Sequence, residues 1–271
     1  MIKKNRLDIH LLTIGLVESR QKAQRIILAG KVRDKNGKIL DKPGLQVPLE
    51  TQIDIISEPK FVSRGGDKLL EAFNQFPINV EDRICIDAGI STGGFSDCLL
   101  QKGAKKIYGI DVGYGQTAWK IRNNPRVKLL ERTNIRYVEP STLYFQTKSR
   151  ADFVVADLSF ISLKLALKPI INLLEEKYNE GVFLIKPQFE VSKEKVGKGG
   201  VVRGEQYHIE AIESVIKAAT QLNWLINGLI ASPLVGPAGN HEYLIWLGTQ
   251  KITRDIFDHK FIKNLVSNTI G

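Results

Sequence analysis

The fold is decided by residues 83–96, which read Arg83-Ile84-Cys85-Ile86-Asp87-Ala88-Gly89-Ile90-Ser91-Thr92-Gly93-Gly94-Phe95-Ser96. The first five residues are mostly apolar and end in an acid, which is typical of a buried strand. The glycines that follow form a turn where a ligand can approach the backbone, and the next helix begins there with open N–H groups. This order predicts the opening unit of an α/β domain.

Three more apolar segments, at residues 106–111, 152–157 and 182–186, are each followed by turn residues and a helix-like pattern. Alternation of this kind predicts a parallel, doubly wound α/β sheet. Two later strands, at 226–231 and 243–247, are separated by too few residues for a crossover helix. We therefore expect them to pair as an antiparallel edge of the sheet.

The glycine-rich turn suits a nucleotide-like ligand, although a bare structural turn has the same pattern. Its spacing is not GxGxxG and it lacks the P-loop lysine, which disfavours a nucleoside triphosphate. An acid before the turn, Asp87, suits the cationic methionine part of S-adenosylmethionine (SAM). Asp111 ends the next strand, where a carboxylate can accept hydrogen bonds from a ribose diol. NAD would use an acid there as well.

Charged residues stand at the ends of two more predicted strands. Lys186 follows an apolar strand, where a lysine is costly to bury without a partner, and Asp157 ends the neighbouring strand. We therefore expect Lys186 and Asp157 to be neighbours, in either a catalytic or a structural ion pair. Lys68 and Glu242 also lie in unusual contexts, beside glycine-rich segments.

The first 60 residues carry half of the excess positive charge of the 271-residue chain. They hold twelve basic and seven acidic residues, an excess of five out of a net +10. The pattern predicts two short helices, the second from Ser19 to Gly30, then a hairpin at Asn36-Gly37 and a strand at 52–56. A basic module of this kind indicates a polyanion-binding surface, although an ordinary solvated face is the alternative.

The segments Arg6-Leu-Asp, Glu18-Ser19-Arg20-Gln-Lys22-Ala and Ala29-Gly30-Lys31-Val32 resemble the S4 RNA-binding domain. This resemblance implies an RNA-binding surface on the second helix and its turn, to which we assign Arg6, Arg20, Lys22 and Arg25. Pro59 and the glycines that follow predict a joint. We expect an S4-like domain at 1–59, a linker at 60–63 and a second domain at 64–271.

Lys68, Asp157, Lys186 and Glu242 read Lys-Asp-Lys-Glu in chain order, which resembles the FtsJ-like RNA ribose 2′-O-methyltransferases. Further motifs resemble the TlyA family, also labelled haemolysin A. They are Asp87-Ala-Gly-Ile-Ser-Thr-Gly-Gly-Phe95, Asp111-Val-Gly-Tyr-Gly-Gln116, Glu131-Arg-Thr-Asn-Ile-Arg136, Ala156-Asp157-Leu-Ser-Phe-Ile-Ser162, Lys186-Pro-Gln-Phe-Glu190, Gly199-Gly-Val-Val202 and Gly239-Asn-His-Glu-Tyr243. The chain departs from the family pattern at Ile90 and Asp67.

The resemblance implies a Rossmann-like SAM-dependent methyltransferase domain with a seven-stranded sheet, acting on the ribose 2′-OH of a cytidine in 16S rRNA, 23S rRNA or both. Lys186 would be the base, Asp157 would orient it, and Lys68 and Glu242 would hold the ribose and the lysine network. The implied cofactor residues are Asp87, Gly89, Ser91, Thr92, Gly93, Gly94, Asp111 and Asn134. Arg64, Arg132 and Arg136 flank this site and are candidates for RNA contact.

Two cysteines and four histidines show no metal-ligand spacing, so we expect no metal site and a reducing, cytoplasmic setting. No signal peptide or membrane span can be drawn. Two alternatives remain, an inactive RNA-binding assembly factor and a haemolysin-like membrane-active protein. Residues 188–206 are rich in glycine and lysine and suggest either a mobile loop over RNA or a plain surface excursion. The three tryptophans, Trp119, Trp224 and Trp246, are expected to be core or edge-packing residues.

Overall fold

A computed structural model describes residues 3–56, 59–145, 147 and 149–271. The chain divides into two compact units, Met1–Pro59 and Lys60–Gly271. The smaller unit contains α1 (Leu7–Thr13), α2 (Arg20–Leu28), β1 (Lys4–Arg6), β2 (Val32–Asp34), β3 (Gln46–Pro48) and β4 (Ile53–Ile55). Each unit has its own hydrophobic core, and each is described here by itself.

The two predicted helices and the strand at 52–56 are confirmed, whereas the arms of the predicted hairpin meet in an isolated bridge between Arg33 and Ile39. Ser19 caps α2, because its side chain accepts a hydrogen bond from the Lys22 N–H at 3.2 Å. Gly37 has φ +80° in the turn after β2, and β2 pairs antiparallel with β4. The pairing of β1 with β3 was not predicted, because each strand is only three residues long and carries no clear alternation.

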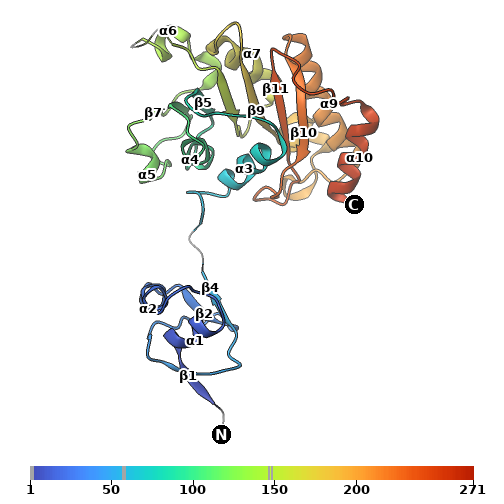
Figure 1. Cartoon of the computed structure of the whole chain (residues 1–271). Coiled ribbons are helices and arrows are strands. Elements are labelled where there is room, and N and C mark those ends of the chain that lie inside the picture. The colour runs from blue at the N-terminus through green and yellow to red at the C-terminus, as the bar shows by residue number, and fades with distance from the viewer. Residues whose placement is uncertain (1–2, 57–58, 146, 148) are drawn as a thin grey trace. The chain divides into compact units, whose positions relative to one another are not determined.

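The larger unit is a seven-stranded mixed sheet in the order β10-β11-β9-β8-β5-β6-β7 (Figure 1). The strands are β5 (Ile84–Ala88), β6 (Lys106–Ile110), β7 (Val127–Leu130), β8 (Phe153–Ala156), β9 (Glu180–Ile185), β10 (Leu225–Ala231) and β11 (Tyr243–Gly248). The first five are parallel, and β11 runs antiparallel to both β9 and β10. The predicted antiparallel edge is confirmed, whereas strand β7 was missed.

Helices cover both faces of this sheet (Figure 1). They are α3 (Gly65–Gln75), α4 (Gly94–Gln101), α5 (Trp119–Arg122), α6 (Pro140–Leu143), α7 (Leu163–Leu173), α8 (Pro187–Glu190), α9 (Glu205–Gln221) and α10 (His259–Ile270), with 3-10 turns η1 (Ile135–Tyr137), η2 (Lys193–Lys195) and η3 (Lys198–Gly200). Alternate strand residues enter two separate cores. One core is packed by α3 and α4, and the other by α7, α9 and α10.

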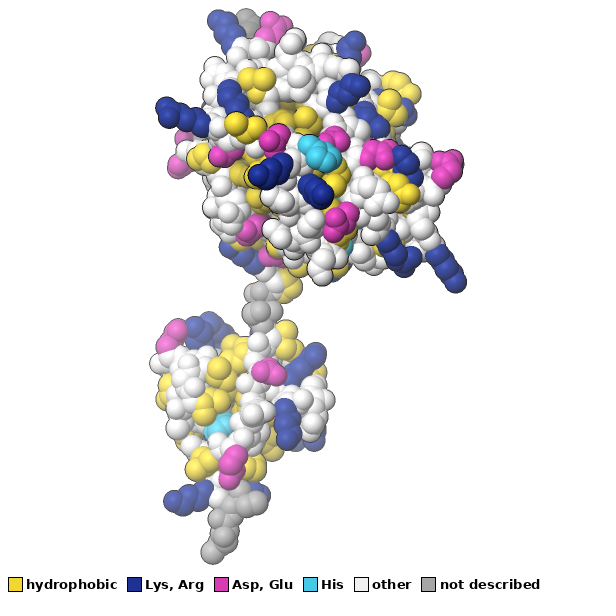
Figure 2. Space-filling view, turned by 90° about the vertical axis from the view of Figure 1, so that its right-hand side faces the viewer, with side chains coloured by type: hydrophobic (Ala, Val, Ile, Leu, Met, Phe, Trp, Pro, Cys, Tyr) yellow, Lys and Arg dark blue, Asp and Glu magenta, His cyan; other side chains and the backbone are white. Residues whose placement is uncertain are grey.

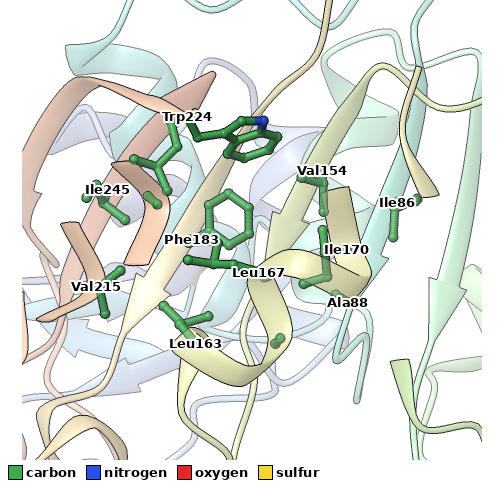
Figure 3. Packing of buried hydrophobic residues seen from close by; sticks show 14 of the residues in the cluster. Ile86, Ala88, Val154, Leu163, Leu167, Ile170, Phe183, Val215, Trp224 and Ile245 are labelled. Atoms are coloured by element: carbon green, nitrogen blue, oxygen red, sulfur yellow. The ribbon is translucent and has the colours of Figure 1, made fainter. Parts of the chain in front are cut away.

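The centre of the second core is aromatic. Phe183 of β9 meets Trp224 edge to face, with ring centroids 5.7 Å apart, and Leu163 and Leu167 of α7 lie close by (Figure 3). This packing holds β9 and α7 together. It therefore positions the two loops that leave the carboxyl ends of β8 and β9.

Residues 60–63 lie within the larger unit. The Phe61 ring is buried in its core, and the Val62 N–H donates to Asp97 Oδ2 at 3.0 Å. Residues 188–206 comprise the end of α8, both short turns η2 and η3, and the start of α9. The amide of Asn240 anchors this stretch, since it accepts from the Val202 N–H at 2.9 Å and donates to the Gly200 carbonyl at 2.8 Å.

Candidate active site

Two adjoining cavities open at the carboxyl ends of the parallel strands. The larger has a volume of about 700 Å³ and the smaller about 290 Å³, and both are lined by Gly89, Ser91, Asp157 and Ser159. This edge of an open α/β sheet is where ligands bind in such folds. The larger cavity falls within the size range of small-molecule sites.

The glycine-rich turn after β5 forms the shared wall. Gly89 has φ +85°, and a Cβ atom there would lie 2.6 Å from the Asp157 carbonyl oxygen. A side chain at Gly94 would collide with the Ser63 hydroxyl at 2.2 Å. Only glycine therefore lets the turn pack against its neighbours and leave its backbone open to a ligand.

Asp111 follows β6 and lines the larger cavity. Its two carboxylate oxygens accept hydrogen bonds from the Ser91 N–H at 2.8 Å and from the Gly113 N–H at 2.7 Å. A carboxylate has about four acceptor positions, so two remain for a ligand's hydroxyl groups. Asn134 lines the same cavity and accepts from the Arg136 N–H at 3.1 Å.

Asp87 and Gly93 line neither cavity. The Asp87 carboxyl is buried under the turn, where its Oδ2 accepts from the Ser96 hydroxyl at 2.6 Å. Burial raises the pKa of Asp87 to about 7, against the opposing effect of the Ser96 hydrogen bond. Ser91 lines both cavities, and Thr92 and Gly94 line the smaller one.

Four charged side chains from four separate segments meet at the smaller cavity, namely Lys68, Asp157, Lys186 and Glu242. The expected pairing of Lys186 with Asp157 is confirmed, with Nζ 2.6 Å from Oδ1. Lys186 also donates to the Ser159 hydroxyl at 2.9 Å. Lys68 of α3 forms a buried ion pair with Glu242, which precedes β11. Charges at this depth are stable only in such pairs.

Glu190 is a buried acid that the sequence analysis missed. Its two oxygens accept from the Ser162 hydroxyl at 2.6 Å and from the Leu163 N–H at 2.7 Å. Ser162 is the N-cap of α7, so the Glu190 charge lies at the positive end of that helix. Burial raises the pKa of Glu190, although both hydrogen bonds act in the opposite direction.

Glu190 therefore ties the loop after β9, which carries Lys186, to the loop after β8, which carries Asp157. A second contact between the same loops is made by Phe189 and Phe160, whose ring centroids are 5.5 Å apart. Phe160 has φ +64°, which is unusual for a bulky residue, and its side chain lines the larger cavity. No sequence pattern signalled this backbone conformation.

The arginines proposed to contact RNA in the larger unit lie around the site. Arg64 lines the smaller cavity and Arg136 the larger. The guanidinium of Arg132 lies 4.3 Å from the centroid of the Tyr114 ring. All three are exposed.

The basic residues assigned to the smaller unit differ in their surroundings. Arg6 and Arg20 both bind the buried carboxylate of Asp8, at 3.1 and 2.9 Å. Lys22 forms an ion pair with Glu18 one helical turn earlier, at 2.8 Å, and Arg25 is exposed. Asp8 therefore fixes two of the four side chains.

Among the described residues, no group of three or more His, Cys, Asp or Glu side chains could hold a metal ion. Both cysteines are free and buried, and burial raises the pKa of Cys98 to about 12. Over the same residues, none of the helices has the length and apolar character needed to cross a membrane.

Two family models match the chain. The FtsJ-like methyltransferase model covers residues 61–249, and the S4 domain model covers residues 5–53. The 16S/23S rRNA (cytidine-2'-O)-methyltransferase TlyA of Mycobacterium tuberculosis is 46% identical over 252 residues, covering 92% of each chain. Hemolysin A of Brachyspira hyodysenteriae is 39% identical and covers 88% of this chain and 98% of its own.

A solved structure named as a hemolysin, from Streptococcus thermophilus, is 38% identical with a TM-score of 0.72 and covers 99% of this chain and 96% of its own. Fold and site together define an α/β methyltransferase preceded by an S4 domain. The chain belongs to the FtsJ-like methyltransferases and, among them, to the TlyA family.

Proposed function

We propose that this chain transfers a methyl group from SAM to the ribose 2′-OH of a cytidine in 16S rRNA, 23S rRNA or both, in the cytoplasm. The observation that carries the proposal is the convergence of Lys68, Asp157, Lys186 and Glu242 on one cavity beside the glycine-rich turn. The names of the relatives support the substrate, since the Mycobacterium tuberculosis protein is named for cytidine-2'-O methylation of both rRNAs.

The larger cavity fits a nucleoside-sized cofactor. Asp111 would hold the ribose hydroxyls and Asn134 would lie near the adenine. The backbone at Gly89, Ser91, Thr92 and Gly94 would lie beside the methionine part, where the missing Cβ atoms leave room. Asp87 and Gly93 would act from beneath, by shaping the turn. Bound SAM supplies a methyl group already activated on a sulfonium, so the transfer requires no metal.

A ribose hydroxyl is a weak nucleophile, so the chain must remove its proton and align its oxygen. Lys186, in its neutral amine form, accepts this proton at Nζ and becomes the ammonium that the Asp157 carboxylate stabilises, and Asp157 and Ser159 fix the direction of that nitrogen. Lys68 and Glu242 hold the other side of the ribose as a preformed pair. The exposed Arg64, Arg132 and Arg136 contact phosphates around the entrance, and Arg6, Arg20, Lys22 and Arg25 contact RNA from the S4 domain.

Methyl transfer from radiolabelled SAM to unmodified 30S and 50S subunits tests the proposal, with wild type compared against Lys186→Ala. We expect label on a ribose with wild type and a large loss with the variant, and nuclease mapping then identifies the nucleotide. SAM binding measured by calorimetry should be retained in both proteins. Binding of SAM without transfer to either subunit would contradict the proposed substrate and favour the RNA-binding assembly factor.

A further inference from the structure

One tryptophan is largely exposed, in contrast to the expectation that all three are core or edge-packing residues. Trp224 and Trp246 are 1% and 0% exposed, whereas Trp119 is 79% exposed at the start of α5. Tyr114, five residues earlier, is 65% exposed. Tyrosine and tryptophan are enriched at interfaces, and exposed apolar surface that forms a patch marks an interaction site.

The segment that carries Trp119 is fixed to the glycine-rich turn. The Thr117 hydroxyl donates to the Ser91 carbonyl at 3.0 Å, and the Ala118 N–H donates to the Thr92 carbonyl at the same distance. Ile121 of α5 packs against Gly93 so closely that a Cβ atom there would lie 3.0 Å away. Trp119 is therefore held beside the residues that line both cavities.

A cation completes this surface. The Arg132 guanidinium lies 4.3 Å from the centroid of the Tyr114 ring, and the backbone N–H of Arg132 donates to the Gly113 carbonyl at 3.0 Å. Lys120 and Arg122 nearby are paired with Asp97 and Glu131. Within the described part of the chain, Arg132 has no acidic partner within 4 Å, so its charge remains available to an anion.

We propose that Tyr114, Trp119 and Arg132 form a platform for single-stranded RNA next to the target nucleotide. The aromatic faces stack on unpaired bases of any sequence, and the stacked guanidinium contacts a phosphate. This inference rests on the proposed function, because it takes RNA as the substrate that enters the cavities. The proposed platform adds base stacking on aromatic rings to the phosphate contacts already proposed for the arginines.

The combination of charge and position favours RNA over a protein partner. The chain has a net charge of +10, and the platform lies beside the cavity entrance that an RNA substrate must reach. On the face of the larger unit drawn in Figure 2, Lys and Arg side chains are interspersed with Asp and Glu, so that face offers no continuous basic patch. An RNA strand can both stack its bases on the exposed aromatic rings and place a phosphate against Arg132, so this surface suits RNA better than a protein partner.

The burial of the other two tryptophans makes Trp119 a specific optical probe. A neutral quencher such as acrylamide reaches Trp119 in the full-length protein, while Trp224 and Trp246 are shielded. We expect a single-stranded RNA oligonucleotide of mixed sequence to protect this emission from acrylamide. The Trp119→Phe variant, which keeps a stacking face, should lose the quenchable component but retain RNA affinity.

Kinetics with unmodified ribosomal subunits provide the second measurement. Trp119→Ala and Tyr114→Ala should each raise KM for the subunit about 5- to 100-fold, the cost of one lost base stack. The kcat and the Kd for SAM should stay within twofold. Ile256→Ala is the matched control, because Ile256 is 76% exposed and precedes α10 beside the opposite edge strand β10.

Unchanged KM in Trp119→Ala, with an active wild type, would overturn the platform and leave the proposed function intact. An inactive wild type would instead contradict the proposed function, and protection of Trp119 by the oligonucleotide would still support the platform. Protection that appears on raising protein concentration without RNA would overturn it in favour of contact between copies of the chain.

Discussion

Lys186 Nζ lies 2.6 Å from Asp157 Oδ1 and 2.9 Å from the Ser159 hydroxyl oxygen. Lys186 donates one hydrogen bond to Ser159, and the Asp157 carboxylate holds its charge as an ion pair. Lys186 and both partners line the smaller cavity, where the ribose hydroxyl is proposed to bind. The ion pair therefore acts as a geometric constraint on the proposed base as well as a stabilising contact.

Asp157→Asn tests this constraint, because it keeps the shape of the side chain and removes its charge. We expect the rate of methyl transfer to fall about 100-fold, the cost of about 1 Å of misplacement at a reacting group. Single-turnover transfer from radiolabelled SAM measures the chemical step directly. Glu210→Gln is the control, since Glu210 pairs with Lys195 at 2.6 Å on a partly exposed surface and should have no effect. Equal rates in wild type and Asp157→Asn would contradict the role.

Glu190→Ala should lower kcat about tenfold or more and destabilise the larger unit by about 1–3 kcal/mol. The physical reason is that the Ser162 hydroxyl and the Leu163 N–H lose their acceptor, which separates the two loops holding Lys186 and Asp157. Glu190→Gln should be milder, because its amide oxygen still accepts from Leu163. Denaturant unfolding and steady-state kinetics measure the two effects.

If Glu190 positions the two loops, its variants should lower kcat and leave KM for the ribosomal subunit unchanged. Loss of stability with unchanged kcat in both Glu190 variants would show that the carboxylate only supports the fold. Recovery of most of the kcat in Glu190→Gln would show that the contact with Leu163 suffices.

The sequence was most informative where local pattern and topology agree. Strand ends of a doubly wound sheet share one edge, so the proximity of Asp157 and Lys186 followed from their places at two strand ends. Strand β7 was missed because Val127–Leu130 is short and contains a lysine. The short strands β1 and β3 were missed because their pairing is set by tertiary contact.

The contacts that sequence could not supply depend on side-chain direction. Glu190 reaches Ser162 across 28 positions, and no spacing rule connects the two. Asp87 is the acid expected before the glycine-rich turn, but its carboxylate lies beneath that turn, where it accepts a hydrogen bond from Ser96, and it lines neither cavity. Trp119 begins a four-residue helix, too short for a pattern to separate a buried face from an exposed one.

Asp8→Asn should weaken the smaller unit at neutral pH but make it less sensitive to acid. Burial raises the pKa of Asp8, but hydrogen bonds from Arg6, Gln24 and Arg20 outweigh it and hold the pKa well below the usual value. A carboxyl with a lowered pKa stabilises the fold above its ordinary pKa near 3.8, and this stability is lost as the pH falls below that value. Amide hydrogen exchange at the buried Leu11 and Ile27 measures this loss of stability of the smaller unit.

Wild type should therefore show faster exchange at pH 3 than at pH 6 after correction for the intrinsic rates, and Asp8→Asn should show little difference. Asp34→Asn is the control, because its carboxylate accepts from the Asn36 and Lys38 N–H groups of an exposed turn and, within the described residues, from no arginine side chain. A parallel acid response in wild type and Asp8→Asn would contradict the importance of the two arginine contacts.

We expect Asp87 to give the free energy of unfolding of the larger unit the opposite pH dependence. Because burial raises its pKa to about 7, the folded chain binds more protons than the unfolded chain between about pH 4 and pH 7. The free energy of unfolding should therefore fall as the pH rises through this window, by on the order of 4 kcal/mol from this group. Asp87→Asn should abolish that fall, and Ser96→Ala should extend it above pH 7 by removing the hydrogen bond that favours the charged form. Urea unfolding followed by the fluorescence of the buried Trp224 and Trp246 measures all three proteins, and identical pH slopes would show that Asp87 titrates normally.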